Sequence, residues 1–236
     1  MENRNKKIII GIVAKHINNN QSKINSLIRD EVKQAIFDNG GIAIGILSPN
    51  EETLYAGNDW KDYEDKIRKE EIIDELNLCD GIILQGGITC EAYESWIAKY
   101  CYDNNIPILG ICAGQNAIAR GLGGTTFKIS NPEKHDRSFD EYVHSIKIDK
   151  ESKFYEIIKK EEIMVNSRHK NSIKDCPNLN KVAFCEDGYP DVIEDSKKNF
   201  YIGVRFHPES LYKKDENMNN IFKAFLEVCK NKYRGN

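Results

Sequence analysis

A short apolar run that ends in a Gly-x-Cys-x-Gly turn constrains this chain more than any other stretch. Residues 106–111, IPILGI, are typical of a strand that is buried on both faces. The run passes through Gly110, Cys112 and Gly114 into residues 115–122, which have the pattern of a helix. A strand that enters a helix through such a turn is the cysteine form of the nucleophile elbow. We therefore expect Cys112 in a strained turn, with its side chain clear of the sheet.

This position suits a thiol, because the positive end of the helix dipole favours the thiolate and lowers the pKa of the cysteine. Free cysteine is also among the most buried residue types, so Cys112 could equally be an ordinary core residue. The five residues alone leave both interpretations open.

The composition narrows the class of protein. The 236 residues suffice for one large domain, and we expect residues 1–236 to form a single domain. A net charge of −3 gives no reason to expect binding to nucleic acid or to an anionic membrane. No run approaches the roughly 18 apolar residues of a membrane span, and residues 8–10 are too short a run for a signal peptide.

The seven cysteines are scattered and form no C-x-x-C pair. Neither a disulfide framework nor a zinc site is expected, and a cytoplasmic location is the better prediction. We expect no metal and no organic cofactor.

Strand and helix patterns alternate along the first half of the chain. Strands are predicted at residues 6–14, 42–47, 80–84 and 106–111, and helices at 22–39, 66–78, 91–102 and 115–122, with a polar loop over 50–64. This order predicts an α/β fold with a central, mostly parallel sheet flanked by helices. Ligands of such sheets bind at the carboxyl ends of the strands, where Gly86, Gly87 and Cys112 lie.

The second half has a different pattern, with additional short strands. They are predicted at residues 125–129, 142–148, 162–165, 181–185, 191–194 and 200–206, with helices at 152–160 and 217–230. The last of these strands ends at His207.

A thiol nucleophile needs a base, and the base needs a group that orients it. Five histidines are available, and His207 stands out because it follows an apolar strand and precedes Glu209 by two residues. In an extended segment these two side chains share a face, so Glu209 could reach the imidazole.

The chain resembles class I glutamine amidotransferases, through Gly110-x-Cys112-x-Gly114 and through residues 203–210, GVRFHPES. The resemblance implies a flavodoxin-like fold with a catalytic triad of Cys112, His207 and Glu209. It also implies an oxyanion hole formed by the backbone N–H of Ala113 and that of Gly86 or Gly87.

Residues 164–169, MVNSRH, are similar to the Val-Asn-Ser-x-His segment of the gamma-glutamyl hydrolase branch, peptidase C26. That branch also has histidines near the positions of His135 and His144. The resemblance implies a substrate pocket with Asn166, Ser167 and His169 on the side of the leaving group. Asn116 stands where the branch usually has glutamine, with Gln115 just before it, and Ala113 replaces the branch's arginine.

The resulting interpretation is a cysteine hydrolase that cleaves gamma-glutamyl amide bonds, such as that of gamma-glutamyl-gamma-aminobutyrate, through a thioester. The alternative is a glutaminase subunit that delivers ammonia to a separate synthase chain. A binding protein on the same fold and a DJ-1-like protein are further alternatives. The expected ligand is a small gamma-glutamyl substrate. The sequence does not determine the oligomeric state, and a homodimer is one possibility.

Overall fold

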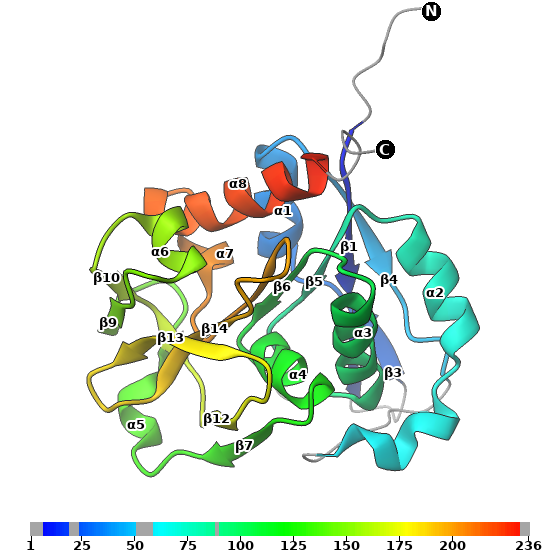
Figure 1. Ribbon diagram of the computed structural model, residues 1–236, viewed down its shortest axis with the longest axis horizontal. Coiled ribbons are helices and arrows are strands. Elements are labelled where there is room, and N and C mark those ends of the chain that lie inside the picture. The colour runs from blue at the N-terminus through cyan, green and yellow to red at the C-terminus, as the bar shows by residue number, and fades with distance from the viewer. Residues whose placement is uncertain (1–6, 19–23, 51–58, 88–89, 232–236) are drawn as a thin grey trace, which may run out of the picture.

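A nine-stranded sheet forms the centre of the part of the chain that the computed structural model describes, namely residues 7–18, 24–50, 59–87 and 90–231 (Figure 1). Its strands, in chain order, are β1 (Ile9–Val13), β4 (Ile42–Ile46), β5 (Gly81–Leu84), β6 (Ile108–Ile111), β9 (His144–Ile148), β10 (Glu162–Val165), β13 (Asn180–Cys185), β14 (Pro190–Glu194) and β15 (Tyr201–Val204). The spatial order is β10-β9-β13-β14-β15-β6-β5-β1-β4. From β15 to β4 all neighbours are parallel, whereas from β10 to β15 they are antiparallel.

Helices cover both faces of this sheet (Figure 1). One face carries α1 (Asp30–Asp38), α6 (Lys153–Ile158), α7 (Pro208–Leu211) and α8 (Glu216–Asn231). The other carries the 3-10 helix η1 (Trp60–Lys66), α2 (Lys69–Asn77), α3 (Ala92–Asp103) and α4 (Ala113–Gly121). A further short helix, α5 (Pro132–His135), lies directly before strand β8 (Asp136–Ser138). No helix in the described part of the chain is both long and apolar enough to cross a membrane.

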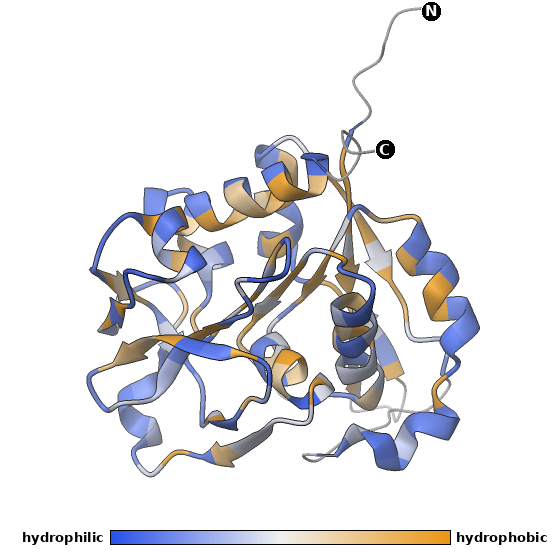
Figure 2. Cartoon of the chain, viewed as in Figure 1, coloured by the Kyte–Doolittle hydropathy of each residue, from blue (hydrophilic) through white to orange (hydrophobic). Residues whose placement is uncertain are grey.

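The alternation of side chains along each strand explains why two apolar cores form. In β5, Ile83 packs with α8, whereas Ile82 and Leu84 face the core beneath α3 and α4. Figure 2 shows the corresponding pattern, with hydrophobic strands at the centre and hydrophilic residues on the outer faces of the helices.

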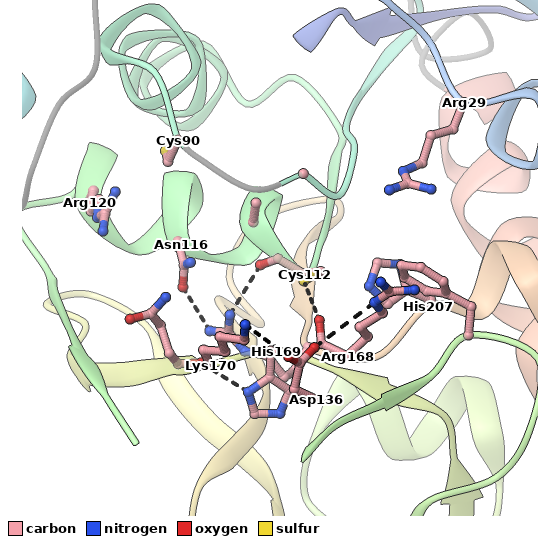
Figure 3. A pocket seen from close by; sticks show the side chains of 15 residues that line it. Arg29, Cys90, Cys112, Asn116, Arg120, Asp136, Arg168, His169, Lys170 and His207 are labelled. Atoms are coloured by element: carbon pink, nitrogen blue, oxygen red, sulfur yellow. Dashed lines mark hydrogen bonds and ion pairs between the residues drawn. The ribbon is translucent and has the colours of Figure 1, made fainter. Parts of the chain in front are cut away.

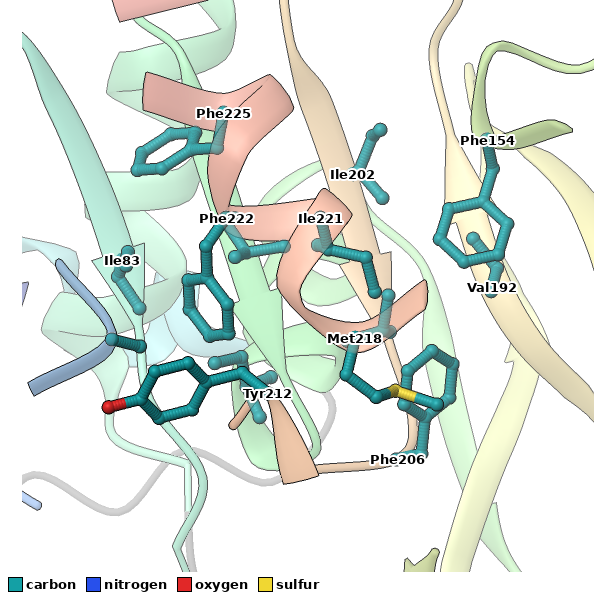
Figure 4. Close-up of a cluster of buried hydrophobic side chains, with 14 of the residues drawn as sticks. Ile83, Phe154, Val192, Ile202, Phe206, Tyr212, Met218, Ile221, Phe222 and Phe225 are labelled. Atoms are coloured by element: carbon teal, nitrogen blue, oxygen red, sulfur yellow. The ribbon is translucent and has the colours of Figure 1, made fainter. Parts of the chain in front are cut away.

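Helix α8 closes the first core. Its apolar stripe includes Met218, Ile221, Phe222 and Phe225, each with no exposed surface, and these side chains lie over the strands in Figure 4. Burial of one such side chain stabilises the fold by about 1.5–3 kcal/mol. The helix therefore fixes β15 in the middle of the sheet, next to the elbow strand β6.

The prediction of an α/β fold with a parallel sheet flanked by helices is confirmed, including the extra strands of the second half. The helix predicted over residues 22–39 is wrong in its first part. Residues of β3 (Ile24–Leu27) pair antiparallel with β2 (Lys15–Asn18), and the helix begins only at Asp30. The apolar side chains of β3 are exposed, so their helical spacing did not mark a buried face. Residue 22 lies outside the described residues.

The strand predicted over residues 125–129 is present as β7 (Thr125–Lys128), whereas the 3-10 helix η1, the partner of β7 and a second short ribbon were not predicted. The polar loop expected over residues 50–64 contains the start of η1, while residues 51–58 lie outside the described residues. Two short antiparallel ribbons also form beside the main sheet: β7 (Thr125–Lys128) with β12 (Asn171–Asp175), and β8 (Asp136–Ser138) with β11 (Ser167–Arg168). Their sequences are short and polar, so they carry little periodic signal.

Candidate active site

Cys112 lies in the turn between β6 and α4, in a backbone conformation that cysteine rarely adopts. Its φ is 51° and its ψ is −101°. A positive φ of this size favours glycine and is strained for other residues. The turn requires glycine on both sides, because a Cβ at Gly110 would lie 2.7 Å from the carbonyl of Gly114. A Cβ at Gly114 would lie 2.0 Å from the carbonyl oxygen of Leu84. The nucleophile elbow predicted from the sequence is therefore present.

The neighbouring strand brings His207 to the same edge of the sheet. Because β15 runs parallel to β6, both strands end at this edge, and the backbone N–H of Cys112 donates to the carbonyl of Val204 at 2.8 Å. His207 Nδ1 lies 2.7 Å from Glu209 Oε1, and both side chains are 2% exposed. The contact forms as predicted but not for the predicted reason. Glu209 belongs to the first turn of α7, with His207 as its N-cap, rather than to an extended segment.

The backbone of His207 is held by the side chain of Asn166. Asn166 Oδ1 accepts from the N–H of His207 at 2.8 Å, and Asn166 Nδ2 donates to the carbonyl of the same residue at 2.8 Å. The ring of Phe139 packs edge-on against the imidazole, with centroids 4.5 Å apart. These contacts fix the position of His207 from two directions.

The thiol of Cys112 and the other ring nitrogen of His207 face the same space. Cys112 Sγ makes a weak contact to the carbonyl of Arg168 at 3.9 Å. His207 Nε2 is buried without a hydrogen bond of ordinary geometry among the described residues, but a looser contact between the thiol and the imidazole contributes to the pKa shifts of both groups. Loose contacts of this kind are common in free enzymes, in which hydrogen bonds to the reacting atoms tighten only around the substrate.

Charges around the thiol favour its ionised form. Burial raises the pKa of Cys112, but the positive charges of His207 and Arg205 outweigh burial and bring this pKa below its usual value of 9.0. Burial alone would lower the pKa of His207, yet the negative charges of Glu209 and of the Cys112 thiolate raise it to about 10. Each group of the pair therefore shifts the other toward its charged form, a thiolate beside an imidazolium.

A cavity of about 640 Å³ opens at Cys112 (Figure 3). In Figure 3, Asn116, Arg120 and Lys170 lie on one side of the cysteine, and His207 and Arg29 lie on the other. The lining residues are Arg29, Gly87, Cys90, Cys112, Ala113, Asn116, Arg120, Asp136, Phe139, Arg168, His169, Lys170, Asn171, Arg205 and His207.

The three residues predicted for the oxyanion hole lie around this cavity. Gly87 and Ala113 line it. Gly86 abuts the imidazole, because a Cβ there would be 2.7 Å from His207 Cε1 and 3.6 Å from the Cβ of Cys112. Only glycine fits at position 86 without displacing the ring.

Of the five residues predicted to bind substrate, the structure brings two to the cavity. Asn116 lines it, and its Oδ1 accepts from Arg205 Nη2 at 2.8 Å. His169 also lines it. Burial and the positive charge of Arg205 lower the pKa of His169 to about 2, so this side chain is neutral.

The other three predicted binding residues are directed elsewhere, which corrects the sequence analysis. Gln115 is buried against β14 and β15, where its Nε2 donates to the carbonyls of Asp191 at 3.1 Å and Gly203 at 3.2 Å. Asn166 holds His207, as described above. Ser167 Oγ donates to the carbonyl of His135 at 2.7 Å, so it joins two backbone segments behind the cavity.

Arg29 and Phe139, which lie beside His207, were not predicted. The guanidinium of Arg29 lies 5.2 Å from the centroid of the Phe139 ring, and that of Arg168 lies 4.5 Å from the same centroid. The ring is therefore flanked by two cations at the cavity wall. Arg29 follows the unpredicted strand β3, and Phe139 lies in a polar segment, so neither carried a signal in the sequence.

The family is shown by comparison with known proteins. The model of the peptidase C26 family matches residues 85–209, a segment that contains Gly86, the elbow and the His207–Glu209 pair. This chain belongs to the peptidase C26 family. The resemblance to class I glutamine amidotransferases is thereby confirmed, and membership indicates an amidohydrolase.

Relatives of this peptidase C26 protein include synthase components. It is 32% identical to a glutamine-hydrolyzing GMP synthase subunit of Methanococcus aeolicus over 159 residues, which cover 66% of this chain and 78% of that protein. It is 36% identical to the glutamine-hydrolyzing GMP synthase of Prochlorococcus marinus over 137 residues, or 56% of this chain. There the match spans only 24% of the relative's length.

A solved structure supports the fold. A Thermoplasma acidophilum protein described as a GMP synthase subunit superposes with a TM-score of 0.67 at 20% identity. The match covers 97% of this chain and 96% of that protein. At this identity the likeness concerns the fold alone.

Proposed function

We propose that this protein is a glutaminase, a cysteine amidohydrolase that releases ammonia from glutamine for a separate synthase chain. The observation that carries the proposal is that the elbow cysteine, Cys112, lies at the same sheet edge as His207 and Glu209. The Nδ1 atom of His207 is 2.7 Å from Oε1 of Glu209. The names of the relatives support glutamine as the substrate and a synthase as the partner. They favour this alternative over the hydrolysis of gamma-glutamyl amines that the sequence analysis placed first.

The proposed reaction assigns one role to each group. The Cys112 thiolate attacks the amide carbon, and the resulting oxyanion accepts hydrogen bonds from the N–H groups of Ala113 and of Gly86 or Gly87. The His207 imidazolium donates its proton to the leaving nitrogen, and the C–N bond breaks to give a thioester. Water, deprotonated by His207, then attacks the thioester, which releases glutamate and regenerates the thiolate.

A second candidate substrate is a gamma-glutamyl amide whose amine carries an anionic group. The leaving nitrogen must lie beside His207, and on that side the cavity is lined by Arg29 and Arg168, which flank Phe139. Arg29 Nε is buried without a hydrogen-bond partner among the described residues. Ammonia offers nothing for these guanidinium groups to bind, whereas a carboxylate or phosphate would accept hydrogen bonds from them.

Kinetics on a small substrate panel distinguish these candidates. Glutamate release is measured from glutamine, from a gamma-glutamyl alkylamine and from gamma-glutamyl-gamma-aminobutyrate, with the wild type and with Arg29→Gln. A glutaminase has its highest kcat/KM on glutamine, and Arg29→Gln leaves that value unchanged within about twofold, since ammonia makes no contact with this residue. Preference for the anionic amide, lost in Arg29→Gln, selects the second candidate. No glutamate from any substrate would refute both.

A further inference from the structure

Three imidazoles and a thiol lie close together beside the cavity, and one of them, His169, is part of its wall. They come from four separate elements: His135 ends α5, His144 begins β9, His169 follows β11, and Cys185 ends β13. The ring centroids of His144 and His169 each lie 5.0 Å from that of His135. One ligand atom each from His135, His144 and Cys185 lies within 4.8 Å of the others.

Four of the six imidazole nitrogens in this cluster have no hydrogen-bond partner among the described residues. These buried atoms are His135 Nδ1, both ring nitrogens of His144 and His169 Nε2. His144 Nε2 does lie 3.6 Å from Asp191 Oδ2, which is too long for a hydrogen bond. Polar atoms buried without a partner are costly and uncommon, so several in one place call for a physical reason.

In two of the rings, one nitrogen contacts a group outside the cluster, which leaves the other nitrogen available to bind a metal. His135 Nε2 lies 3.1 Å from Asp187 Oδ2, which leaves its Nδ1 as the inward atom. His169 Nδ1 lies 3.1 Å from the carbonyl of Asn171 and must donate to it, which leaves Nε2 with a lone pair. A carboxylate or carbonyl on the outer nitrogen is the usual support of a metal-binding histidine.

We propose that His135, His144, Cys185 and His169 bind one zinc ion. A thiolate with imidazoles is the donor set that zinc prefers, in a tetrahedral arrangement with Zn–N of about 2.0–2.1 Å and Zn–S of about 2.3 Å. The ligand atoms of His135, His144 and Cys185, which lie within 4.8 Å of one another, need to approach by about 1 Å to reach these distances, and that of His169 needs to move further. Binding replaces the thiol proton of Cys185 with the metal and releases that proton to solvent. The carboxylates of Asp187 and Asp191, beside His135 and His144, more than offset the remaining single positive charge.

Four protein ligands leave no open position, so the ion has a structural role rather than a catalytic one. It joins α5, β9 and β13 to the end of β11, where Arg168 and the next residue, His169, contribute to the cavity wall. The sequence analysis expected no zinc site because the cysteines form no C-x-x-C pair. These ligands are separated by at least nine residues and meet only in the folded chain, so no spacing motif could reveal them.

The test uses the full chain with zinc and with Co²⁺ as a spectroscopic probe. Elemental analysis should find about one zinc per chain, and its removal by a chelator should lower the Tm reversibly. Co²⁺ added to the stripped protein should give the intense visible bands of a tetrahedral site and a sulfur-to-cobalt charge-transfer band. Cys185→Ser should abolish the charge-transfer band, whereas Cys176→Ser, which changes a cysteine outside the cluster, should retain it.

A second variant covers the case in which Cys185→Ser does not fold. His144→Gln keeps the thiol and an amide of similar size, and it should weaken zinc retention at least about tenfold, measured by competition with a chelator. Absence of bound zinc together with absence of tetrahedral cobalt bands would overturn the proposal. Equal metal binding by Cys185→Ser and Cys176→Ser would do the same.

Discussion

The ring of His207 occupies the space that any side chain at Gly86 would need, since a Cβ there would lie 2.7 Å from His207 Cε1. Gly86→Ala should therefore displace the imidazole from Cys112 and lower kcat about 100-fold, the scale of a misplacement near 1 Å. Gly45→Ala is a matched control, because its Cβ would lie at the same distance, 2.7 Å, from the flexible end of Ile28, and neither residue lines the cavity. Steady-state kinetics with a thermal melt check both variants. Equal activity of the two would contradict the predicted steric role.

The strained backbone of Cys112 predicts an unusual ranking of stabilities. Both Cys112→Ala and Cys112→Gly should lose at least about 10³ in turnover, because each removes the nucleophile. Glycine relieves the positive-φ strain that alanine retains, so Cys112→Gly should be about 1 kcal/mol more stable than Cys112→Ala despite its greater chain entropy. Urea unfolding followed by circular dichroism measures this difference. A more stable alanine variant would mean that the turn holds no strain.

Asn166 should act by positioning His207. Asn166→Ala removes both hydrogen bonds to the backbone of His207, so kcat should fall about 100-fold with little change in KM. Ser167→Ala removes a buried hydrogen bond from the adjacent residue without touching His207, and it should keep kcat within a few-fold. If both variants lost kcat equally, the effect would be a general loosening of the segment.

The thiolate–imidazolium pair predicts a pH dependence with two limbs. The pKa of Cys112 lies below 9.0, so alkylation by iodoacetamide should have its midpoint below pH 9.0. In His207→Gln the positive charge is lost while burial remains, so the midpoint should move upward. Cys79, whose pKa burial raises to about 12, should not react over this range. An unchanged midpoint in His207→Gln would show that His207 does not stabilise the thiolate.

The alkaline limb concerns the proton on His207. This proton is present below the raised pKa of about 10 and is lost as pH rises through it. Since the leaving nitrogen takes this proton, kcat/KM should fall above about pH 10. Stopped assays at constant ionic strength measure this fall in kcat/KM. Recovery of activity after return to about pH 8 shows that the protein has not unfolded irreversibly at high pH.

Local signals explain which parts of the site could be predicted. The glycines on either side of Cys112 form a spacing that can be recognised in the sequence, although the contact that requires Gly114 is with Leu84 of the neighbouring strand β5. Glu209 follows His207 by two residues, and the two meet whether the segment is extended or begins a helix. Neither inference needed knowledge of distant contacts.

The unpredicted parts depend on contacts between distant segments. Arg29 lies at the cavity because the preceding strand β3 pairs with β2. The apolar residues of β3 are exposed, but their spacing is also that expected of a helix, so the sequence did not predict this strand. Asn166 was assigned to substrate because of its neighbours in the sequence, whereas its side chain bonds to a residue 41 positions away. Gln115 next to the elbow faces the sheet rather than the cavity, since one helix position rotates a side chain by about 100°.

The place of β15 in the sheet has a consequence for how this chain is made. Strand β15 lies between β14 and β6, yet it is the last strand of the described chain to leave the ribosome. Until it arrives, β6 and β14 each present an unpaired edge, a surface prone to pair with other chains. A chain stopped before Tyr201 would therefore contain the elbow cysteine and still be a substrate for chaperones rather than an enzyme.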